Sequence, residues 1–310
     1  MDFEEFITGK DDVNRRLDKV IRIFIPSLPL SSIYKALRKG LIKVNNSKCK
    51  EDYRIQTNDV IQVADFLVKQ ETVTQKKEKP QVELDSSLII FENEHFLILN
   101  KPAGINVHGT GKNEASLEQL VQDYYNKTRK NDSLSFRPGP LHRIDKYTQG
   151  LVCFSMSTAG AQWFSKNLSE HNIKKTYVAL VEGIVKKQER WTDKIQKSQE
   201  KTGRDAFHTM QIHNEDPING DSKECITTVI PINTVKKGEI ELTYVNFLIE
   251  TGRQHQIRAQ SGWHGHPLYG DIAYGGHKTL DNKGKFYLVA QSLEFPPNEL
   301  GLPQKIELKK

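Results

Sequence analysis

Asp145 is the side chain whose surroundings in the sequence point most directly to chemistry. The segment His142–Leu151 places this carboxylate two residues after Arg143 and shortly before Gly150. The apolar run Val152–Phe154 follows at once and predicts a strand. Catalytic groups concentrate on loops that a rigid sheet holds in place. The pattern therefore indicates an aspartate that acts as a nucleophile or as an acid–base group.

Tyr177 and Arg258 are the side chains predicted to act with Asp145. Arg258 ends the segment Thr251–Arg258, and a guanidinium beside a carboxylate keeps that carboxylate ionised. Tyr177 lies in an apolar run that predicts a strand, and its ring and hydroxyl suit contact with a base. Taken one at a time, these residues have simpler interpretations: Arg258 could form a structural ion pair, and Tyr177 could be a tyrosine packed on a sheet. Three such motifs in one chain favour the catalytic interpretation.

Apolar runs predict the strands that must position these residues. Residues 88–91 and 96–99 are separated by a short polar stretch, which predicts a hairpin. Further strands are expected near residues 151–155, 177–181, 226–232 and 240–249. Strands and helices do not alternate regularly, so we expect an α+β fold with a mixed, largely antiparallel sheet and flanking helices. The polar segment 188–222 is predicted to be a long loop or insertion.

Length and composition divide the chain into two predicted domains. A chain of 310 residues exceeds the usual size of one domain. Residues 13–68 predict two helices followed by a small β element. Residues 69–86 are polar, charged and interrupted by Pro80, which is typical of a linker. Residues 87–310 then form the second domain, which carries Asp145.

Positive charge is concentrated in the first of these domains. The net charge of the chain is +6, but the window from Asn14 to Lys50 has ten basic residues and one acid, a net +9, which leaves −3 for the remainder. Such a patch suits a phosphate backbone or an anionic membrane surface. A polar surface without a partner explains so one-sided a charge less well.

The composition also argues against several classes of protein. Cys49, Cys153 and Cys225 are widely spaced and odd in number, so neither a disulfide framework nor a metal-binding cysteine pair is expected. No apolar run reaches the roughly 20 residues that a membrane-spanning helix needs, and the acidic first residues lack the apolar core of a secretory signal. We expect a monomer in a reducing cytoplasm, without membrane contact.

The motifs around the candidate residues resemble those of pseudouridine synthases of the large-ribosomal-subunit (RluA) type. The segments that carry the resemblance are His142–Leu151, Lys175–Gly183, Thr251–Arg258, Asn100–His108 and Gly265–Gly275. Tyr147 and Gln149 depart from the acidic residue and serine that usually follow the catalytic aspartate in this family. These departures leave the three candidate residues intact, so they put the substrate in question more than the reaction.

Residues 13–68 resemble the RNA-binding domain named after ribosomal protein S-four. The residues that match are Arg16–Asp18, Ser32, Gly40, Val44–Asn45 and Asp59. The family's usual glycine before this aspartate is replaced by Asn58, which also tolerates a positive φ. The basic side chains expected to contact RNA are Arg16, Lys19, Lys35, Arg38, Lys39 and Lys43.

The two resemblances together imply an isomerase that converts specific uridines to pseudouridine in structured RNA, with large-subunit ribosomal RNA as the expected partner. In this interpretation Asp145 acts on the ribose, Tyr177 stacks on the base and Arg258 stabilises the charge on Asp145. Arg143 would fill the stack that the extruded nucleotide leaves. The other expected substrate-binding residues are His142, Lys101, Arg253 and Ile257. Neither a cofactor nor a metal is expected.

Three alternatives stay open at this point. The substrate could be transfer RNA, or the chain could be a non-catalytic RNA-binding or ribosome assembly factor with the same fold. A third alternative is a glycosidase that cuts the same bond and releases the base. Such enzymes commonly use two carboxylates, and no acidic partner of Asp145 is evident in the sequence.

Overall fold

The chain forms two units, each described here by itself. The structure, a computed structural model, describes residues 1–68, 83–109, 115–129, 133–202, 207–213, 221–279 and 286–309. The small unit comprises residues 1–84, 120–139 and 156–159, and the large unit comprises the rest. Most of the predicted linker lies outside the described residues. The predicted boundaries of the two domains therefore stay predictions.

A three-stranded antiparallel sheet and helices form the small unit. Its elements are β1 (Phe3–Ile7), η1 (Lys10–Asp12), α1 (Leu17–Phe24), α2 (Leu30–Lys39), β2 (Ile42–Val44), β3 (Val60–Ala64) and α3 (Asp65–Val68), and the strand order is β1-β3-β2. The core contains Leu17 and Ile21 from α1, Ile33 from α2 and Ile61 from β3, all fully buried. The strand β1 was not predicted, and it begins before the predicted domain boundary at residue 13.

Residues with a left-handed backbone end or turn the elements of the small unit as predicted. Gly40 closes α2 with a φ of 70°, and its backbone N–H reaches the carbonyls of Ala36 and Leu37. Asn45 and Asn58 have φ values of 49° and 64°, which asparagine tolerates better than most residues. At the other end of α2, Pro29 is the N-cap and no side chain caps the helix, although Ser31 and Ser32 have the side chains that the sequence predicts for a cap.

The carboxylate of Asp12 ties a later segment of the chain to the small unit. Its oxygens accept hydrogen bonds from the hydroxyls of Ser133 and Ser135 at 2.7 and 2.5 Å and from the backbone of Leu134 at 2.9 Å. Asp11 likewise accepts from the backbone N–H of Thr158 at 2.6 Å. Two neighbouring acids therefore fasten residues that follow them by more than a hundred positions.

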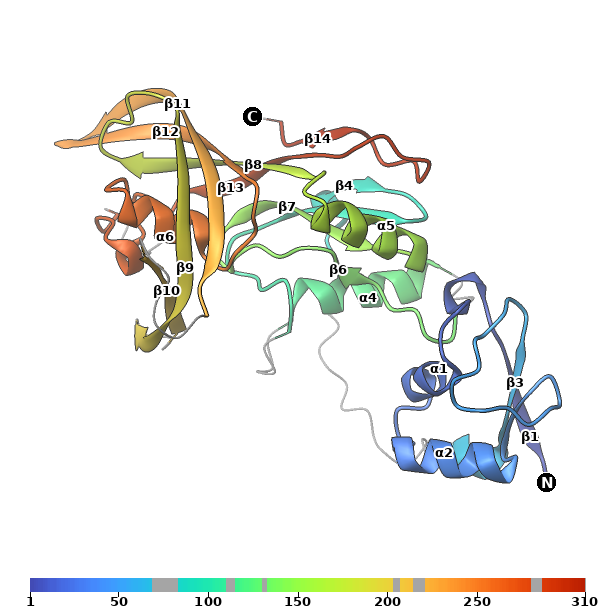
Figure 1. The fold of residues 1–310 in the computed structure, drawn as a ribbon. Helices are drawn as coiled ribbons and strands as arrows, with labels where there is room; N and C mark the ends of the chain where they lie inside the picture. The colour runs from blue at the N-terminus through green and yellow to red at the C-terminus, as the bar shows by residue number, and fades with distance from the viewer. Residues whose placement is uncertain are drawn as a thin grey trace. The chain divides into compact units, whose positions relative to one another are not determined.

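The large unit is built on one large mixed sheet, which is mostly antiparallel, as predicted (Figure 1). Its strands are β4 (Ile89–Glu92), β5 (Phe96–Lys101), β7 (Gln149–Ser155), β8 (Lys174–Glu182), β9 (Glu189–Thr202), β10 (Phe207–His213), β11 (Lys223–Lys237), β12 (Ile240–Ile249) and β13 (Leu288–Glu294). The main path runs β10-β9-β11-β12-β8-β13-β7-β5-β4, while the short strands β6 (Gly139–Pro140) and β14 (Lys305–Glu307) pair with β7 and β13. The predicted hairpin of β4 and β5 is confirmed.

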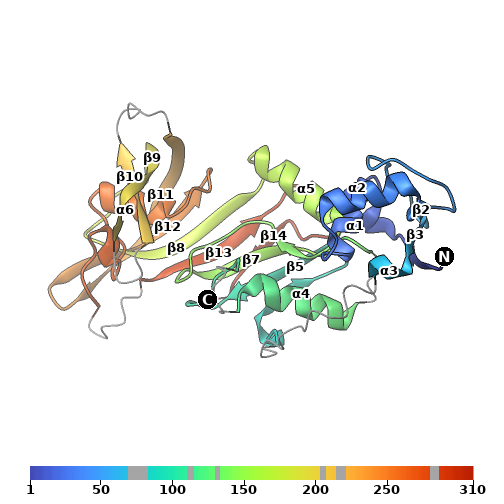
Figure 2. The same ribbon diagram turned by 90° about the horizontal axis from the view of Figure 1, so that it is seen from below.

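Strand β13 joins the two halves of this sheet. It pairs antiparallel with β8 and parallel with β7, and Figure 2 shows it between them. The approach to β7 is close at Gly150, where φ is 110° and an added Cβ would lie 2.4 Å from the carbonyl oxygen of Ala290. Only glycine fits such a backbone and such a contact without strain. The predicted loop of Asp145 enters the sheet directly ahead of this contact.

The prediction of a long loop or insertion at residues 188–222 is wrong for the described part of that segment. The strands β9 and β10 pair antiparallel, and β9 also pairs with β11. Ile195, Ile212 and Cys225 from these strands pack with Ala259 in a small core. The segment is therefore an extension of the sheet with a packing role of its own.

The remaining helices include α6 (Gln256–Trp263), which carries part of the candidate site. They are α4 (Leu117–Thr128), α5 (Thr158–Ser169) and α6, with the short helices η3 (Ser86–Leu88) and η4 (Ile272–Tyr274). Phe164 of α5 packs with Ile98 of β5 and Cys153 of β7. Figures 1 and 2 show α6 beside the β9–β10 hairpin. Among the described residues, no helix combines the length and apolar character needed to cross a membrane.

Candidate active site

Asp145 lies on the loop ahead of β7, and its side chain is 18% exposed. Two cationic or titratable groups face it: the Arg258 Nη1 lies 3.7 Å from Oδ2, and the His255 Nε2 lies 3.9 Å from Oδ1. The Thr148 N–H donates to the Asp145 carbonyl at 3.1 Å, which closes the turn. The carboxylate is thus partly open to solvent and is flanked by an arginine and a histidine.

Arg258 is held by a different carboxylate from the predicted one. Its Nε and Nη2 donate to Asp271 Oδ2 and Oδ1 at 2.7 and 2.8 Å, a bidentate pair in which both residues are buried. The guanidinium also lies over the rings of Tyr274 and Phe286, at 4.8 and 4.6 Å from their centroids. These contacts fix the plane of the guanidinium, and they leave Nη1 directed toward Asp145.

Tyr177 on β8 is buried, with 7% of its surface exposed. It pairs with Phe247 of β12 and Ala290 of β13, so its place in the sheet is fixed from both sides. Burial raises the pKa of the Tyr177 hydroxyl, and the charge of Asp145 raises it further. The hydroxyl therefore stays protonated at neutral pH, where it can donate a proton or a hydrogen bond but does not act as a ready base.

A hydrogen-bonded chain that was not predicted reaches Asp145 through His255. The backbone N–H of Met210 on β10 donates to the Tyr274 hydroxyl at 2.8 Å, and this hydroxyl lies 2.8 Å from the His255 Nδ1. The His255 Nε2 then faces Asp145. A carboxylate opposite Nε2 favours the tautomer that carries its proton there, which leaves Nδ1 to accept from Tyr274.

The first residues of α6 take their positions from Gln256. Its side-chain carbonyl accepts from the Thr251 hydroxyl at 2.8 Å and from the Arg253 backbone at 3.0 Å. His255 adopts a left-handed backbone with φ 51° at the start of the helix. The helix itself packs on the β9–β10 hairpin through Ala259. The loop and the hairpin together therefore set where His255 and Arg258 point.

Lys101 supports the Asp145 loop from within the protein. It is fully buried, and its ammonium donates to the carbonyls of Pro102, Ile105 and Lys146 at 2.9, 3.0 and 2.9 Å. Burial lowers its pKa to about 8, while the charge of Asp145 opposes the shift. Three acceptors match the three hydrogens of an ammonium group, so they also favour the charged form. Lys101 was predicted to bind substrate, but its contacts are those of a group that holds the loop.

A cavity of about 480 Å³ brings most of the predicted residues together. The predicted residues that line it are His142, Arg143, Asp145, Tyr177, Arg253, Ile257 and Arg258. Lys101 is not among the lining residues. Lys175 and His255 line the cavity as well, although neither was predicted. Lys175 and His255 lie inside motifs quoted above. For Lys175 the sequence carried a usable signal, because residues i and i+2 of a strand share a face and Tyr177 follows Lys175 at that spacing.

His142 faces the protein more than the cavity. Its Nε2 accepts from the backbone N–H of Cys153 at 3.1 Å, and its ring stacks on Phe164 with the centroids 6.0 Å apart. Burial lowers its pKa to about 3, and the nearby charge of Lys175 adds to the shift. These contacts suit a neutral residue that joins the loop to β7.

The histidines near α6 each have a separate polar partner. The His264 Nε2 lies 3.1 Å from Asp193 Oδ2, and the His266 Nδ1 lies 2.9 Å from the Glu182 carbonyl. His255 faces Asp145. Among the described residues, no three His, Cys, Asp or Glu side chains gather in an arrangement that could hold a metal.

The basic residues predicted to bind RNA differ in their solvent exposure and in their contacts within the protein. Lys19 on α1 and Lys35, Arg38 and Lys39 on α2 are exposed. Arg16 donates to Asp18 at 3.1 and 2.9 Å, and the Lys43 ammonium lies 4.6 Å from the centre of the Phe3 ring.

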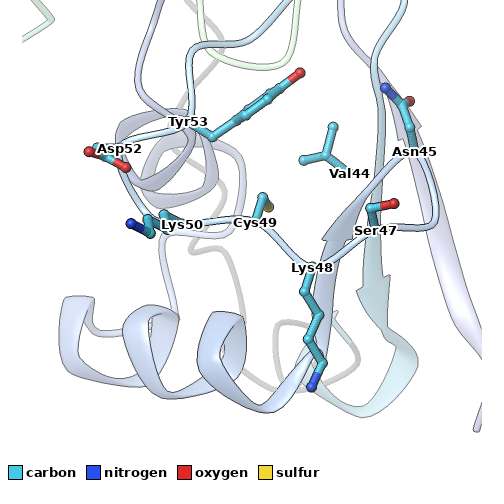
Figure 3. Close-up of a pocket in the computed structure, with 8 residues that line it drawn as sticks. All are labelled: Val44, Asn45, Ser47, Lys48, Cys49, Lys50, Asp52 and Tyr53. Carbon is cyan, nitrogen blue, oxygen red and sulfur yellow. The ribbon is translucent and has the colours of Figure 1, made fainter.

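A hollow of about 490 Å³ also lies in the small unit, after β2. Its lining residues are Val44, Asn45, Ser47, Lys48, Cys49, Lys50, Asp52 and Tyr53. Figure 3 shows the Lys48 side chain pointing away from the Tyr53 ring, which extends toward the side of Asn45. The Tyr53 hydroxyl donates to Asp59 at 3.0 Å, which ties the ring to the sheet.

The comparisons with known proteins agree with this geometry. A family model described as RNA pseudouridylate synthase matches residues 95–262, a range that includes Asp145, Tyr177 and Arg258. The chain belongs to this family. The synthase is therefore an RNA uridine isomerase, which confirms the predicted reaction and excludes the glycosidase alternative. The match of the family model does not extend to the small unit's sheet and helices, so the resemblance of residues 13–68 to the S-four domain stays a prediction.

Curated relatives resemble the synthase over most of their length. The ribosomal large subunit pseudouridine synthase C of Buchnera aphidicola subsp. Acyrthosiphon pisum is 30% identical over 271 residues, which cover 86% of this chain and 79% of the relative. The protein of the same name from Vibrio parahaemolyticus is 28% identical and covers 97% of this chain and 93% of its own.

A solved structure shares the fold of the synthase. Human RNA pseudouridylate synthase domain containing 1 superimposes with a TM-score of 0.53 at 20% identity. The superposition covers 74% of this chain and 86% of the human one. At this identity the likeness shows the fold alone.

Proposed function

We propose that the synthase isomerises specific uridines in large-subunit ribosomal RNA, with Asp145 as the residue that acts on the ribose. The observation that supports this most directly is that Asp145, Tyr177 and Arg258 line one cavity. The relatives' shared name, ribosomal large subunit pseudouridine synthase C, supports the choice of RNA. The relatives also extend over nearly the whole chain, so they include both of its units.

The reaction balances without any added group. The bond between N1 of uracil and C1′ of the ribose breaks, and a bond between C5 and C1′ forms. The hydrogen on C5 is lost while N1 ends with a hydrogen, so mass and oxidation state are unchanged. The groups needed are a carboxylate at the sugar, a surface that retains the detached base, and a proton donor.

The three residues match these needs. Asp145 faces the Arg258 guanidinium and keeps part of its surface open to the cavity. Tyr177 presents a protonated hydroxyl and a ring on the cavity wall, so it is suited to stack on the base and to donate a proton late in the reaction. Arg143 is exposed at the cavity and can stack in the space that the extruded nucleotide leaves.

The small unit is proposed to hold the RNA. Exposed basic side chains on α1 and α2, with Lys48 and Lys50 beside the hollow of Figure 3, provide positive charge for a phosphate backbone. RNA affinity should therefore fall steeply with salt. A dissociation constant that does not change between low and high salt would argue against this role.

The deciding experiment compares pseudouridine maps of cellular RNA with and without this gene. Cells that lack it are rescued by the wild type or by Asp145→Asn. We expect particular uridines of large-subunit ribosomal RNA to lose the modification and to regain it only with the wild type. Loss of sites in transfer RNA alone would assign the other substrate. Full rescue by Asp145→Asn would show that Asp145 does not carry the chemistry.

A further inference from the structure

Lys175 is a buried cation on the wall of the cavity. It is the second residue of β8, it has 7% of its surface exposed, and it lines the cavity that holds Asp145. Buried and more exposed residues alternate along this strand, so Lys175 and Tyr177 lie on the same face. Its neighbour Lys174 lies on the opposite face and is exposed.

The ammonium of Lys175 is not neutralised within the described part of the chain. There it makes neither a hydrogen bond nor an ion pair. Glu250, which also lines the cavity, is engaged by both terminal nitrogens of Arg190. Asp145 is flanked by Arg258 and His255 instead. A charge removed from water without a partner is costly, and burial accordingly lowers the pKa of Lys175.

The whole cavity has an excess of positive charge. Its permanently or normally cationic residues are Arg143, Lys175, Arg253 and Arg258, and its acids are Asp145 and Glu250. An uncharged uracil does not balance this excess. In RNA the negative charge resides on the phosphates, and lysine binds phosphate as a compact point charge.

We propose that Lys175 binds a backbone phosphate next to the target uridine, while Tyr177, two residues along the same strand, contacts the base. This inference rests on the proposed function, because it assumes that a uridine enters this cavity. The binding energy of the phosphate would position the ribose at Asp145, so Lys175 is a positioning residue. The phosphate would also supply the missing partner of the buried Lys175 ammonium.

The test uses short RNA hairpins that carry a mapped target uridine. In each hairpin one phosphate near this uridine is replaced by an uncharged methylphosphonate. Binding is measured for the wild type, for Lys175→Met and for the control Lys174→Met, which removes an equal charge from the opposite face of β8. Thermal unfolding checks the variants, and Lys175→Met is expected to fold because it removes an unpaired buried charge.

We expect one methylphosphonate position to weaken binding of the wild type by about tenfold, the usual scale of a charge-assisted hydrogen bond. The same methylphosphonate should weaken binding of Lys175→Met only slightly, since this variant has already lost the contact with that phosphate. Lys174→Met should keep the full penalty. The salt dependence of log Kd should also become shallower by about 0.7 for Lys175→Met, as for the loss of one single-strand phosphate contact.

The proposal would be overturned if, at every phosphate position, the loss of affinity caused by the methylphosphonate simply added to the loss caused by Lys175→Met. So would slower turnover of Lys175→Met with every methylphosphonate penalty retained, because that result would assign the ammonium to the base. These outcomes differ from a failure of the proposed function. In that case the wild type itself would not isomerise any mapped hairpin, whatever its backbone.

Discussion

Arg258 faces two carboxylates, Asp271 and Asp145, but forms close hydrogen bonds with Asp271 alone. Its distances to Asp271 are 2.7 and 2.8 Å, against 3.7 Å to Asp145. The buried pair fixes the direction of the positive charge before any substrate arrives. Asp145 keeps its oxygens available for the ribose, because the arginine does not chelate it. Asp271 is thus a positioning residue for the guanidinium that faces Asp145, the carboxylate proposed to act on the ribose.

The variant Asp271→Asn tests this relationship. It removes one charge of a buried pair, so we expect a loss of about 3–5 kcal/mol in the free energy of unfolding, with a large fall in kcat. Glu307→Gln is the matched control, because Glu307 pairs with Lys305 at the surface with both side chains about half exposed. The control should change stability by at most about 1 kcal/mol. Chemical denaturation and single-turnover assays measure the two effects, and wild-type kcat in Asp271→Asn would contradict the role.

Tyr274→Phe tests the chain from Met210 to His255. The variant keeps the ring on Arg258 and removes only the hydroxyl that lies 2.8 Å from each partner. We expect kcat to fall by about tenfold, with a changed pH profile and nearly unchanged RNA affinity, since the two part-buried hydrogen bonds of this hydroxyl are lost. Tyr287→Phe, at a tyrosine with 43% of its surface exposed, is the control. Equal rates for both variants at every pH would show that the hydroxyl has no part in positioning His255.

Lys101→Met tests the support of the loop that carries Asp145. The variant removes the ammonium that donates to three part-buried carbonyls, of which that of Lys146 keeps a second donor, the Gly104 N–H at 2.8 Å, so we expect a loss of about 2–4 kcal/mol in stability. Turnover of the folded fraction should also decrease, because the carbonyl of Lys146 adjoins Asp145. Thermal unfolding and active-site titration separate the two effects. Unchanged stability would mean that the carbonyls find other donors.

Gly150→Ala tests the close contact of β7 with β13. The new methyl group would meet the Ala290 backbone at 2.4 Å, on a backbone with φ 110°. We expect little folded protein at any temperature. Gly139→Ala is the control, since nothing lies within 4 Å of its added Cβ. The control should remain within about 1 kcal/mol of the wild type, and a well-folded Gly150→Ala would refute the described strand register.

Acid should destabilise the synthase partly through His142. Its pKa is about 3 in the folded protein and near 6.5 when exposed. Between these values the unfolded chain binds more protons, so stability falls as the pH decreases from 6.5. Going down to about pH 4.5, this residue accounts for at most about 3 kcal/mol. His142→Gln can still accept from Cys153 and should show a smaller loss between these pH values in urea unfolding. An equal loss would assign the acid sensitivity to other groups.

The sequence predicted the parts of the site that local patterns determine. Apolar runs located β7 and β8, and Asp145, Tyr177 and Arg258 do line one cavity. Their catalytic roles stay predictions. The partnership of Arg258 with Asp271 was missed because it depends on how α6 and η4 pack, which no local pattern specifies.

The hairpin of β9 and β10 shows a second limit of sequence patterns. In β9 the buried Trp191 and Ile195 are four residues apart, a spacing that fits a strand and a helix alike, and the residue between them on the same strand face is the polar Asp193. Many polar residues surround them, so the segment has the composition of a loop. Its strands form because β11 offers a partner and α6 covers one face. Tertiary context therefore decides its structure.

The place of β13 has a consequence for how the enzyme is made. Residues 288–294 enter between β7 and β8, which come much earlier in the sequence. A ribosome therefore releases the strands next to Asp145 and Tyr177 well before it has synthesised the strand that holds them in register. Nascent chains should stay inactive, and susceptible to proteases along two unfilled strand edges, until translation is nearly finished.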